Sequence, residues 1–502
     1  MKRNDFLYGA TAIGLAGCTT SSGASGNGPL LPTVGVGAGS SSDLRYGFAP
    51  VPASNAAAGF DPAGDAAALI LPGNPPSPAT APIPGVQFFG STGTDNRYVI
   101  RVPTAWNGKL VVAGTPSQRS EFANDAIWSD FLLANGYAYA SSNKALPFNA
   151  IVEPISASPN PNISWPVCYD LAGLETAKFS FRLSEIYPAK KPINGWNTEF
   201  YNLILAAQAY LTQNYKTPTK TYVVGLSNGG AEVRSLLEQH PEIVDGGVDW
   251  SGPYWSQNLN ILTYLPGFLK LMPGYVASNF SDATIAAQIQ ALGYPADVKG
   301  AGAAHPSLWL EYYSGQASFY SDLTLFVYAL LIDPAATSTL PSTASFTPNP
   351  ANPTRLPGTP SAGVSGLADP VARQNYVLST AGKAAIAPFA HTGNIGKPLV
   401  SIAGANDMFI TPQNNFTPYL NAVKAAGKSS MYWQYLVSGG THVDTFANPT
   451  WGYGLQPQVT FAWAAFNELV SIAESGAKPA GAGTQQTVST PTQIHSAARV
   501  SR

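Results

Sequence analysis

The sequence predicts an α/β protein with a mostly parallel central sheet and one large insertion. Short apolar runs rich in β-branched residues alternate with amphipathic segments, which is the pattern of a parallel sheet flanked by helices. This alternation stops after residue 252 and resumes at residue 398. Of the 502 residues, 45% are hydrophobic and 11% are charged, and the formal net charge is −2. The chain can therefore bury a large core, and its charge excludes the basic footprint of a nucleic-acid-binding protein.

The expected elements follow one another in the order that a parallel sheet requires. Helix 198–215 is expected because apolar residues recur at helical spacing, as at Ile204, Ala207 and Leu211. Helix 231–239 is expected to end at a His-Pro pair, because proline cannot continue a helix. The other expected elements are strands 97–102, 109–113, 137–141, 221–224, 244–248, 398–403 and 432–437 and a closing helix 457–475.

The remaining parts of the chain divide into two ends and one insertion. Residues 18–85 are rich in Ser, Gly, Ala and Pro and predict a flexible tether, and residues 476–502 predict a disordered tail. Residues 253–397 are too long for a structureless loop inside a compact domain. We therefore expect an inserted cap domain there, between core parts 86–252 and 398–475.

The N-terminus carries a processing signal. A basic start is followed by the short, mostly apolar stretch 6–17, and the residues Leu-Ala-Gly-Cys at 15–18 resemble the bacterial lipobox. The stretch is too short to span about 30 Å of hydrocarbon. The resemblance implies that residues 1–17 are a signal peptide and that Cys18 is lipidated. Thr19, in place of Asp, favours an exported protein anchored by lipid to the outer membrane or cell surface. Cys168 is the second of two cysteines, which excludes a disulfide scaffold.

The strongest motif lies between a predicted strand and a predicted helix. Gly225-Leu226-Ser227-Asn228-Gly229 matches G-x-S-x-G in the context that gives the motif its meaning: a strand ends, the chain turns sharply and a helix begins. Glycine is expected at both ends because the tight turn leaves no room for a side chain beside the serine. Ser227 is the predicted nucleophile.

A serine nucleophile needs a base and an acid that orients the base. Among the five histidines, His442 follows the last predicted strand in a Gly-rich loop, while His391 is a weaker competitor at the junction of cap and core. Asp407 lies just past the preceding strand and fits the chain order Ser, Asp, His. Two rival acids are Asp444, only two residues from the histidine, and Asp249, at the end of strand 244–248. We predict the triad Ser227, Asp407 and His442.

Acyl transfer also requires donors for the oxyanion. One expected donor is the backbone N–H of Asn228, directly after the nucleophile. The second should come from the loop after strand 109–113. Pro116 has no N–H, so Thr115 or Ser117 must serve, and the sequence leaves this choice open.

Over residues 96–475, the chain resembles the α/β-hydrolase superfamily. The resemblance rests on the strand order, on the turn that carries Ser227, and on an acid and a histidine, Asp407 and His442, that follow the last strands. The resemblance implies an α/β-hydrolase core with a cap, a serine hydrolase acting on carboxylic esters, and no cofactor. Tannases and feruloyl esterases are similar in their large cap but typically carry cysteines beside the acid and the histidine, where this chain has Asn406 and Thr441. Exported polyhydroxyalkanoate depolymerases and hydroxybutyrate-oligomer hydrolases are similar in their serine turn. The sequence contains no HExxH, P-loop or paired CxxC motif for a metal or nucleotide.

Aromatic residues suggest where a substrate binds. The inserted segment contains a Pro-rich loop at 345–360 and an aromatic-rich helical stretch at 306–332, whose aromatics we interpret mainly as packing within the cap. Trp250, Tyr254 and Trp255 follow a core strand and are better placed to line the cleft. They favour apolar or aromatic esters or polyester oligomers. The alternatives are a peptidase or amidase of the same fold and a non-catalytic, surface-binding lipoprotein.

Overall fold

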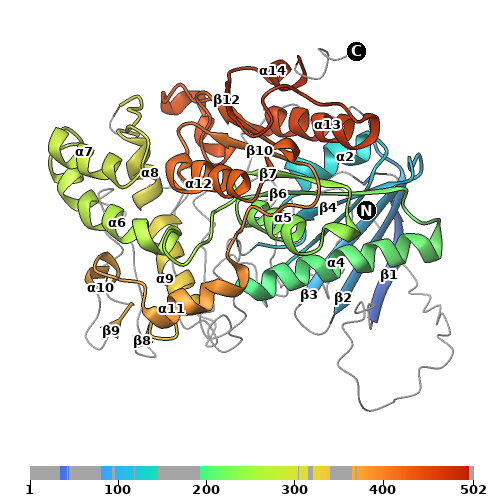
Figure 1. The fold of residues 1–502 in the computed structure, drawn as a ribbon, viewed down its shortest axis with the longest axis horizontal. Coiled ribbons are helices and arrows are strands. Elements are labelled where there is room, and N and C mark those ends of the chain that lie inside the picture. Colours follow the sequence, from blue (N-terminus) through green and yellow to red (C-terminus); the bar gives the residue numbers. More distant parts are fainter. Residues whose placement is uncertain are drawn as a thin grey trace, which may run out of the picture.

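The computed structural model describes residues 34–41, 43–44, 81–92, 96–117, 119–144, 193–302, 305–314, 320–339, 365–367 and 370–496 (Figure 1). The predicted signal peptide, Cys18, Cys168 and the Pro-rich loop 345–360 lie outside these residues.

A ten-stranded sheet forms the centre of the molecule, in the order β1-β2-β3-β5-β4-β6-β7-β10-β11-β12. The first three pairings are antiparallel, and every pairing from β5–β4 to β11–β12 is parallel. The predicted α/β class with a mostly parallel sheet is therefore confirmed. The strands are β1 (Val34–Ser41), β2 (Gly85–Thr92), β3 (Asn96–Pro103), β4 (Lys109–Gly114), β5 (Ala138–Ser142), β6 (Lys220–Leu226), β7 (Gly246–Trp250), β10 (Leu399–Gly404), β11 (Tyr432–Val437) and β12 (Gln485–Val488).

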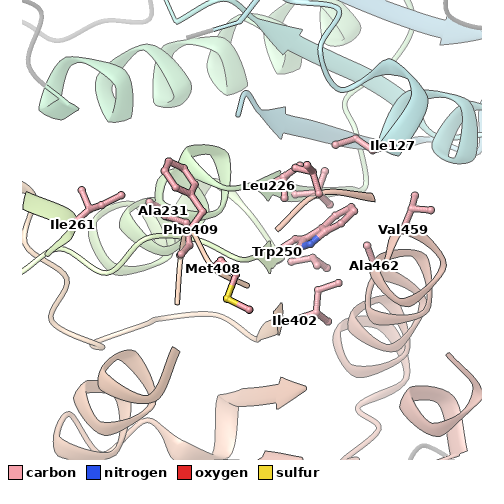
Figure 2. Packing of buried hydrophobic residues seen from close by; sticks show 14 of the residues in the cluster. Ile127, Leu226, Ala231, Trp250, Ile261, Ile402, Met408, Phe409, Val459 and Ala462 are labelled. Carbon is pink, nitrogen blue, oxygen red and sulfur yellow. The ribbon is translucent and has the colours of Figure 1, made fainter. Parts of the chain in front are cut away.

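Helices cover both faces of the sheet because its strands are apolar on both sides. On β4, Leu110 and Val112 belong to one buried cluster, while Val111 and Ala113 belong to the other, as the two-residue period of a strand requires. The first cluster packs against α4 (Ile193–Asn214), α5 (Asn228–Gln239) and α12 (Pro412–Ala425). The second packs against α2 (Asp130–Ala134) and α13 (Val459–Ser475). In Figure 2, Trp250 lies in this second cluster with Leu226 and Ile402, near Val459 and Ala462 of α13.

The chain between β7 and β10 forms a helical layer beside the sheet (Figure 1). Its described residues contribute no strand to the ten-stranded sheet. Helix α6 packs against α7, α8, α9 and α10. The elements of this inserted segment are α6 (Ile261–Ala277), α7 (Ala283–Ala291), α8 (Leu308–Ser314), α9 (Tyr320–Ile332), β8 (Ser338–Thr339), β9 (Ser365–Gly366), α10 (Pro370–Gln374) and α11 (Thr380–Ile386).

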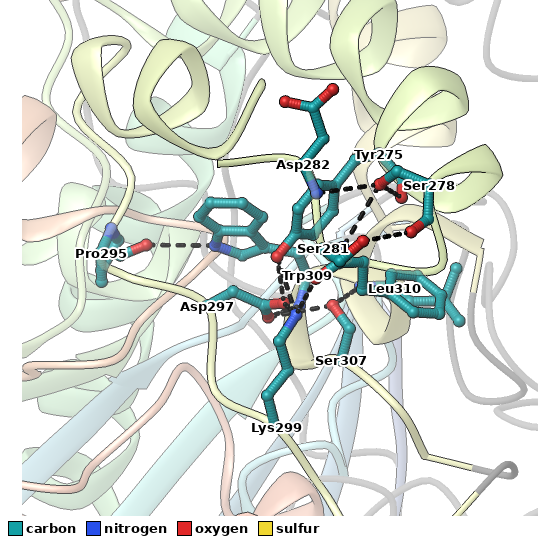
Figure 3. A network of polar contacts seen from close by, with 11 residues as sticks. Tyr275, Ser278, Ser281, Asp282, Pro295, Asp297, Lys299, Ser307, Trp309 and Leu310 are labelled. Atoms are coloured by element: carbon teal, nitrogen blue, oxygen red, sulfur yellow. Dashed lines mark hydrogen bonds and ion pairs between the residues drawn. The ribbon is translucent and has the colours of Figure 1, made fainter. Parts of the chain in front are cut away.

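A polar network fixes the start of α8 within this segment (Figure 3). The Asp297 carboxylate accepts hydrogen bonds from the Ser307 hydroxyl at 2.9 Å and from the Trp309 backbone N–H at 3.1 Å, and it also pairs with Lys299. The Ser307 hydroxyl in turn accepts the N–H of Leu310 at 3.2 Å. Backbone N–H groups of the first turn, which have no partner within the helix, are thus satisfied by side chains.

Two stretches assigned to the tether and the tail belong to the sheet instead, which corrects the prediction. Strand β1 pairs with β2 at one edge, and β12 pairs with β11 at the other. Ile494, on α14 (Thr492–Ser496), is fully buried, and α14 packs against α13. The outer strands of a sheet leave N–H and C=O groups unpaired. A short segment with few apolar residues can satisfy them, and hydrophobic periodicity does not detect such a segment.

Candidate active site

The predicted nucleophile lies at a strained turn between β6 and α5. Ser227 has φ 58° and ψ −123°, a conformation that is unusual for a residue other than glycine. Its backbone N–H donates to the carbonyl of Trp250 on the neighbouring strand β7, at 2.8 Å. The strain is thus held by the sheet, and Ser227 stands at the carboxyl end of a central parallel strand.

Glycines on either side of Ser227 make this turn possible. A Cβ at Gly225 would lie 2.2 Å from the backbone of Gly229, and a Cβ at Gly229 would lie 2.1 Å from the carbonyl oxygen of Gly114. Both distances are far below van der Waals contact. The close approach of α5 to the ends of β4 and β6 therefore requires glycine at both positions, as the motif predicts.

The loops after β10 and β11 bring the predicted acid and base together. Nδ1 of His442 lies 2.8 Å from Oδ2 of Asp407. The other carboxylate oxygen accepts the backbone N–H groups of Phe409 at 2.9 Å and Ile410 at 2.8 Å. Asp407 is fully buried, so its carboxylate is fixed by these three contacts. In the described part of the chain, Ser227 Oγ makes no hydrogen bond to His442; this contact is often loose until substrate binds.

Both rival acids have structural partners. The Asp444 carboxylate accepts the backbone N–H groups of Gln458 at 2.6 Å and Val459 at 3.0 Å, at the start of α13. Burial raises the pKa of Asp444 to about 7, although these hydrogen bonds oppose the shift. Asp249 forms a buried ion pair with Arg234 at 2.6 Å. Neither carboxylate is bonded to His442.

The competing histidine is also a structural residue. Nδ1 of His391 accepts the backbone N–H of Trp255 at 3.2 Å, and Nε2 lies 3.3 Å from both the carbonyl of Ala231 and the hydroxyl of Ser235. Burial, assisted by the charge of Arg234, lowers the pKa of His391 to about 3. The ring is therefore neutral at physiological pH and both of its nitrogens are engaged.

The loop after β4 rests on a buried ion pair that the sequence did not reveal. Lys144 Nζ lies 2.7 Å from Glu232 of α5, and both side chains are buried. The same glutamate lies against the end of β4, because a Cβ at Gly114 would be 2.8 Å from Glu232 Oε2. Burial raises the pKa of Glu232 to about 7 and lowers that of Lys144. Ser117, one of the two candidate oxyanion donors in this loop, is half-buried and has φ 47°.

The predicted substrate-binding aromatics are mostly buried, which corrects their placement. Trp250 lies in the core of the sheet, because β7 is a central strand covered on both faces (Figure 2). Trp255 is 1% exposed and packs edge-on against Phe389, with ring centroids 5.5 Å apart. Only Tyr254 is half-buried, with its backbone N–H bonded to Asn415 at 2.9 Å.

Two tyrosines of the inserted segment contact the predicted catalytic loops instead. The hydroxyl of Tyr312 on α8 accepts the backbone N–H of His442 at 3.3 Å. The side-chain amide of Asn228 donates to the hydroxyl of Tyr328 on α9. Both tyrosines belong to the aromatic stretch that we interpreted as internal packing, and no spacing in the sequence singles them out.

The described residues contain no group of three or more His, Cys, Asp or Glu side chains that could hold a metal ion. No helix in the described ranges is both long and apolar enough to cross a bilayer.

The structure has the features of the α/β-hydrolase fold. These are the strand order, a strained serine between β6 and α5, and a histidine after β11 that is paired with an aspartate after β10. The fold class expected from the sequence is thereby confirmed.

Comparison with solved structures found similar chains among esterases. Feruloyl esterase B from Aspergillus oryzae has 14% identity and a TM-score of 0.45, over 89% of this chain and 90% of that chain. Tannin acyl hydrolase from Aspergillus niger has 15% identity and a TM-score of 0.38, over 79% and 80%. The rice cell wall degrading esterase LipA from Xanthomonas oryzae has 11% identity and a TM-score of 0.38, over 89% and 98%. No family model and no curated protein matches the chain.

Proposed function

We propose that this chain is a serine hydrolase that cleaves carboxylic esters through an acyl-enzyme on Ser227. The observation that carries the proposal is a strained serine at the end of β6 together with a buried histidine–aspartate pair at the same edge of the sheet. All three groups follow parallel strands, and the carboxyl ends of parallel strands meet at one edge. The same arrangement activates serine in unrelated hydrolases.

The reaction would proceed in two steps, acylation of Ser227 and hydrolysis of the acyl-enzyme. His442 Nε2 accepts the hydroxyl proton of Ser227 while Oγ attacks the ester carbonyl, and Asp407 holds the Nδ1–H tautomer of the imidazole. The tetrahedral intermediate collapses when His442 protonates the departing alcohol, which leaves an acyl-enzyme. Water then attacks this acyl group and gives up a proton to His442. The second intermediate collapses when His442 returns this proton to Ser227 Oγ, which releases the carboxylic acid and restores the enzyme.

Backbone N–H groups would stabilise the oxyanion in both steps. The N–H of Asn228 is the first donor, at the start of α5, where the helix dipole also favours negative charge. The second donor would be the backbone N–H of Thr115 or of Ser117, in the loop after β4.

The substrate class is proposed from the sequence, which favours apolar or aromatic esters or hydroxyalkanoate oligomers. Of the predicted contacts, Tyr254 keeps partly accessible surface. A panel of p-nitrophenyl esters of increasing chain length, aryl esters, hydroxyalkanoate oligomers and peptides would define it. Faster cleavage of peptides than of esters would favour the peptidase alternative, and no cleavage or serine labelling would favour the non-catalytic binding protein.

Replacing Ser227 with alanine tests the proposal. We expect kcat for p-nitrophenyl butyrate to fall by at least about 10⁴-fold, because loss of the nucleophile removes the covalent path. Ser471→Ala, a serine of α13 placed outside the proposed site, is the control and should keep wild-type activity. Activity that survives in the Ser227→Ala variant would show that the nucleophile is another group.

Lipid anchoring at Cys18 is a separate proposal. Metabolic labelling with an alkyne fatty acid should tag the wild-type protein in its bacterial membrane fraction. The Cys18→Ser variant should lose the label, and a label that persists in this variant would contradict the assignment.

A further inference from the structure

Helix α8 of the inserted segment touches the loop that carries His442. The Tyr312 hydroxyl accepts the backbone N–H of His442 at 3.3 Å and shares a hydrogen bond with the Thr441 hydroxyl at 2.9 Å. Tyr312 is fully buried. A single hydroxyl group from the insertion therefore contacts two successive residues of the histidine loop.

The ring of Tyr312 packs against two phenylalanine rings, one of which belongs to a residue that holds the acid. Its centroid lies 4.5 Å from that of Phe446 and 6.2 Å from that of Phe409, to which it is nearly parallel, with an interplanar angle of 13°. Phe409 packs edge-on against the imidazole of His442 at 5.2 Å. The backbone N–H of Phe409 also holds the Asp407 carboxylate. Tyr312 is thus in direct contact with the supports of both the base and the acid.

The position of this hydroxyl is set by the network at the start of α8. Asp297 and Ser307 cap the first turn of the helix, where Ser307 also accepts the N–H of Leu310 (Figure 3). Tyr312 follows within the same short helix, Leu308–Ser314. A buried side chain on an anchored helix can hold a loop in one place.

We propose that Tyr312 is a positioning residue that holds the histidine loop so that His442 faces Asp407 and Ser227. This inference rests on the proposed function and deepens it, because it makes the inserted segment part of the catalytic geometry. Small displacements of a general base lower the rate strongly. Without the Tyr312 hydroxyl, the Thr441 hydroxyl and the His442 N–H would lose their shared partner, and the loop would sample other positions.

A set of conservative variants tests this role. For Tyr312→Phe we expect kcat for p-nitrophenyl butyrate to fall about tenfold while KM stays within about twofold, as for a lost hydrogen bond that matters in the transition state. Thr441→Val should have a similar effect, whereas Thr441→Ser keeps the hydroxyl and should retain most of the activity. The double variant Tyr312→Phe with Thr441→Val should be little worse than Tyr312→Phe alone, because Tyr312→Phe already removes the contact with Thr441.

Tyr294→Phe is the matched control. The Tyr294 hydroxyl is buried in the inserted segment and has no hydrogen-bond partner among the described residues. Its removal should leave kcat unchanged. Should Tyr312→Phe fold poorly, the comparison of Thr441→Val with Thr441→Ser still measures the contact.

A second readout separates this inference from the proposed function. The low-field proton NMR signal of the His442 Nδ1–H, hydrogen-bonded to Asp407, should broaden in Tyr312→Phe and Thr441→Val and stay sharp in Tyr294→Phe. Wild-type protein that hydrolyses no ester would contradict the proposed function, while this signal would still test Tyr312. A Tyr312→Phe variant with kcat within twofold of wild type and an unchanged signal would overturn the inference.

Discussion

The segment after β10 and the segment after β11 each present a buried aspartate, but the two carboxylates have different partners. Asp407 is 0% exposed and Asp444 is 1% exposed. One oxygen of Asp407 is bonded to the imidazole of His442, whereas both oxygens of Asp444 accept backbone N–H groups of Gln458 and Val459. Asp444 is much nearer to the histidine in sequence, yet Asp407 contacts its ring. The comparison shows that the direction of the parallel strands decides which carboxylate reaches the imidazole of His442, and nearness along the chain does not.

Replacing each acid with its amide separates catalysis from structure. For Asp407→Asn we expect kcat/KM for p-nitrophenyl butyrate to fall by about 10³- to 10⁴-fold, because the amide favours the wrong histidine tautomer. Asp444→Asn is the matched control and should change kcat/KM by less than about threefold. The measurement is steady-state kinetics well below the unfolding temperature of both variants.

Two results with these variants would contradict the assignment of Asp407 and Asp444. A large loss of kcat/KM in Asp444→Asn with normal folding would mean that this acid orients the histidine in solution. Near wild-type activity in Asp407→Asn would remove Asp407 from the proposed mechanism.

A smaller effect is expected in the pH dependence of stability. Burial raises the pKa of Asp444 from 3.8 to about 7. Between these values the folded protein keeps a proton that the unfolded chain releases, so the contribution of this group to the free energy of unfolding falls as the pH rises from about 4 to 7. One pKa unit corresponds to about 1.4 kcal/mol. We expect Asp444→Asn to reduce the loss of stability between pH 5 and pH 8 by roughly 2 kcal/mol.

Urea unfolding at both pH values measures this difference. Glu232 and Glu468 also have pKa values raised to about 7 by burial, so they add losses of the same sign in both proteins. Comparing variant with wild type removes their contribution. A loss of stability that is as large in Asp444→Asn as in wild type would show that Asp444 is ionised throughout this range.

The core of the fold could be predicted because its elements have strong local signals. The expected strand 432–437 coincides with β11. The helix expected at 198–215 ends one residue after α4 (Ile193–Asn214), although α4 begins five residues earlier than expected. The contact between Asp407 and His442 follows from two adjacent parallel strands, whose ends must lie together. The triad members could therefore be proposed from chain order and loop position alone.

Other features depend on contacts that sequence patterns do not carry. The edge strands β1 and β12 are set by pairing with the sheet. The sequence places Trp250 just past a strand and so beside the cleft, but the residue belongs to β7, where neighbouring strands and α13 cover it. Two further contacts join segments that are far apart in the sequence, between Lys144 and Glu232 and between Tyr312 and Thr441. They form only when the helices pack against the sheet, so no local sequence pattern predicts them.

The central claim, that Ser227 is an activated nucleophile, is tested most directly by labelling the intact protein with a fluorophosphonate probe and mapping the modified peptide by mass spectrometry. An ordinary serine hydroxyl does not react, whereas one with an oriented base does. We expect a single adduct on Ser227 that disappears in the Ser227→Ala variant and forms far more slowly in His442→Ala. A folded wild-type protein that remains unlabelled, or an adduct on a different serine, would contradict the claim.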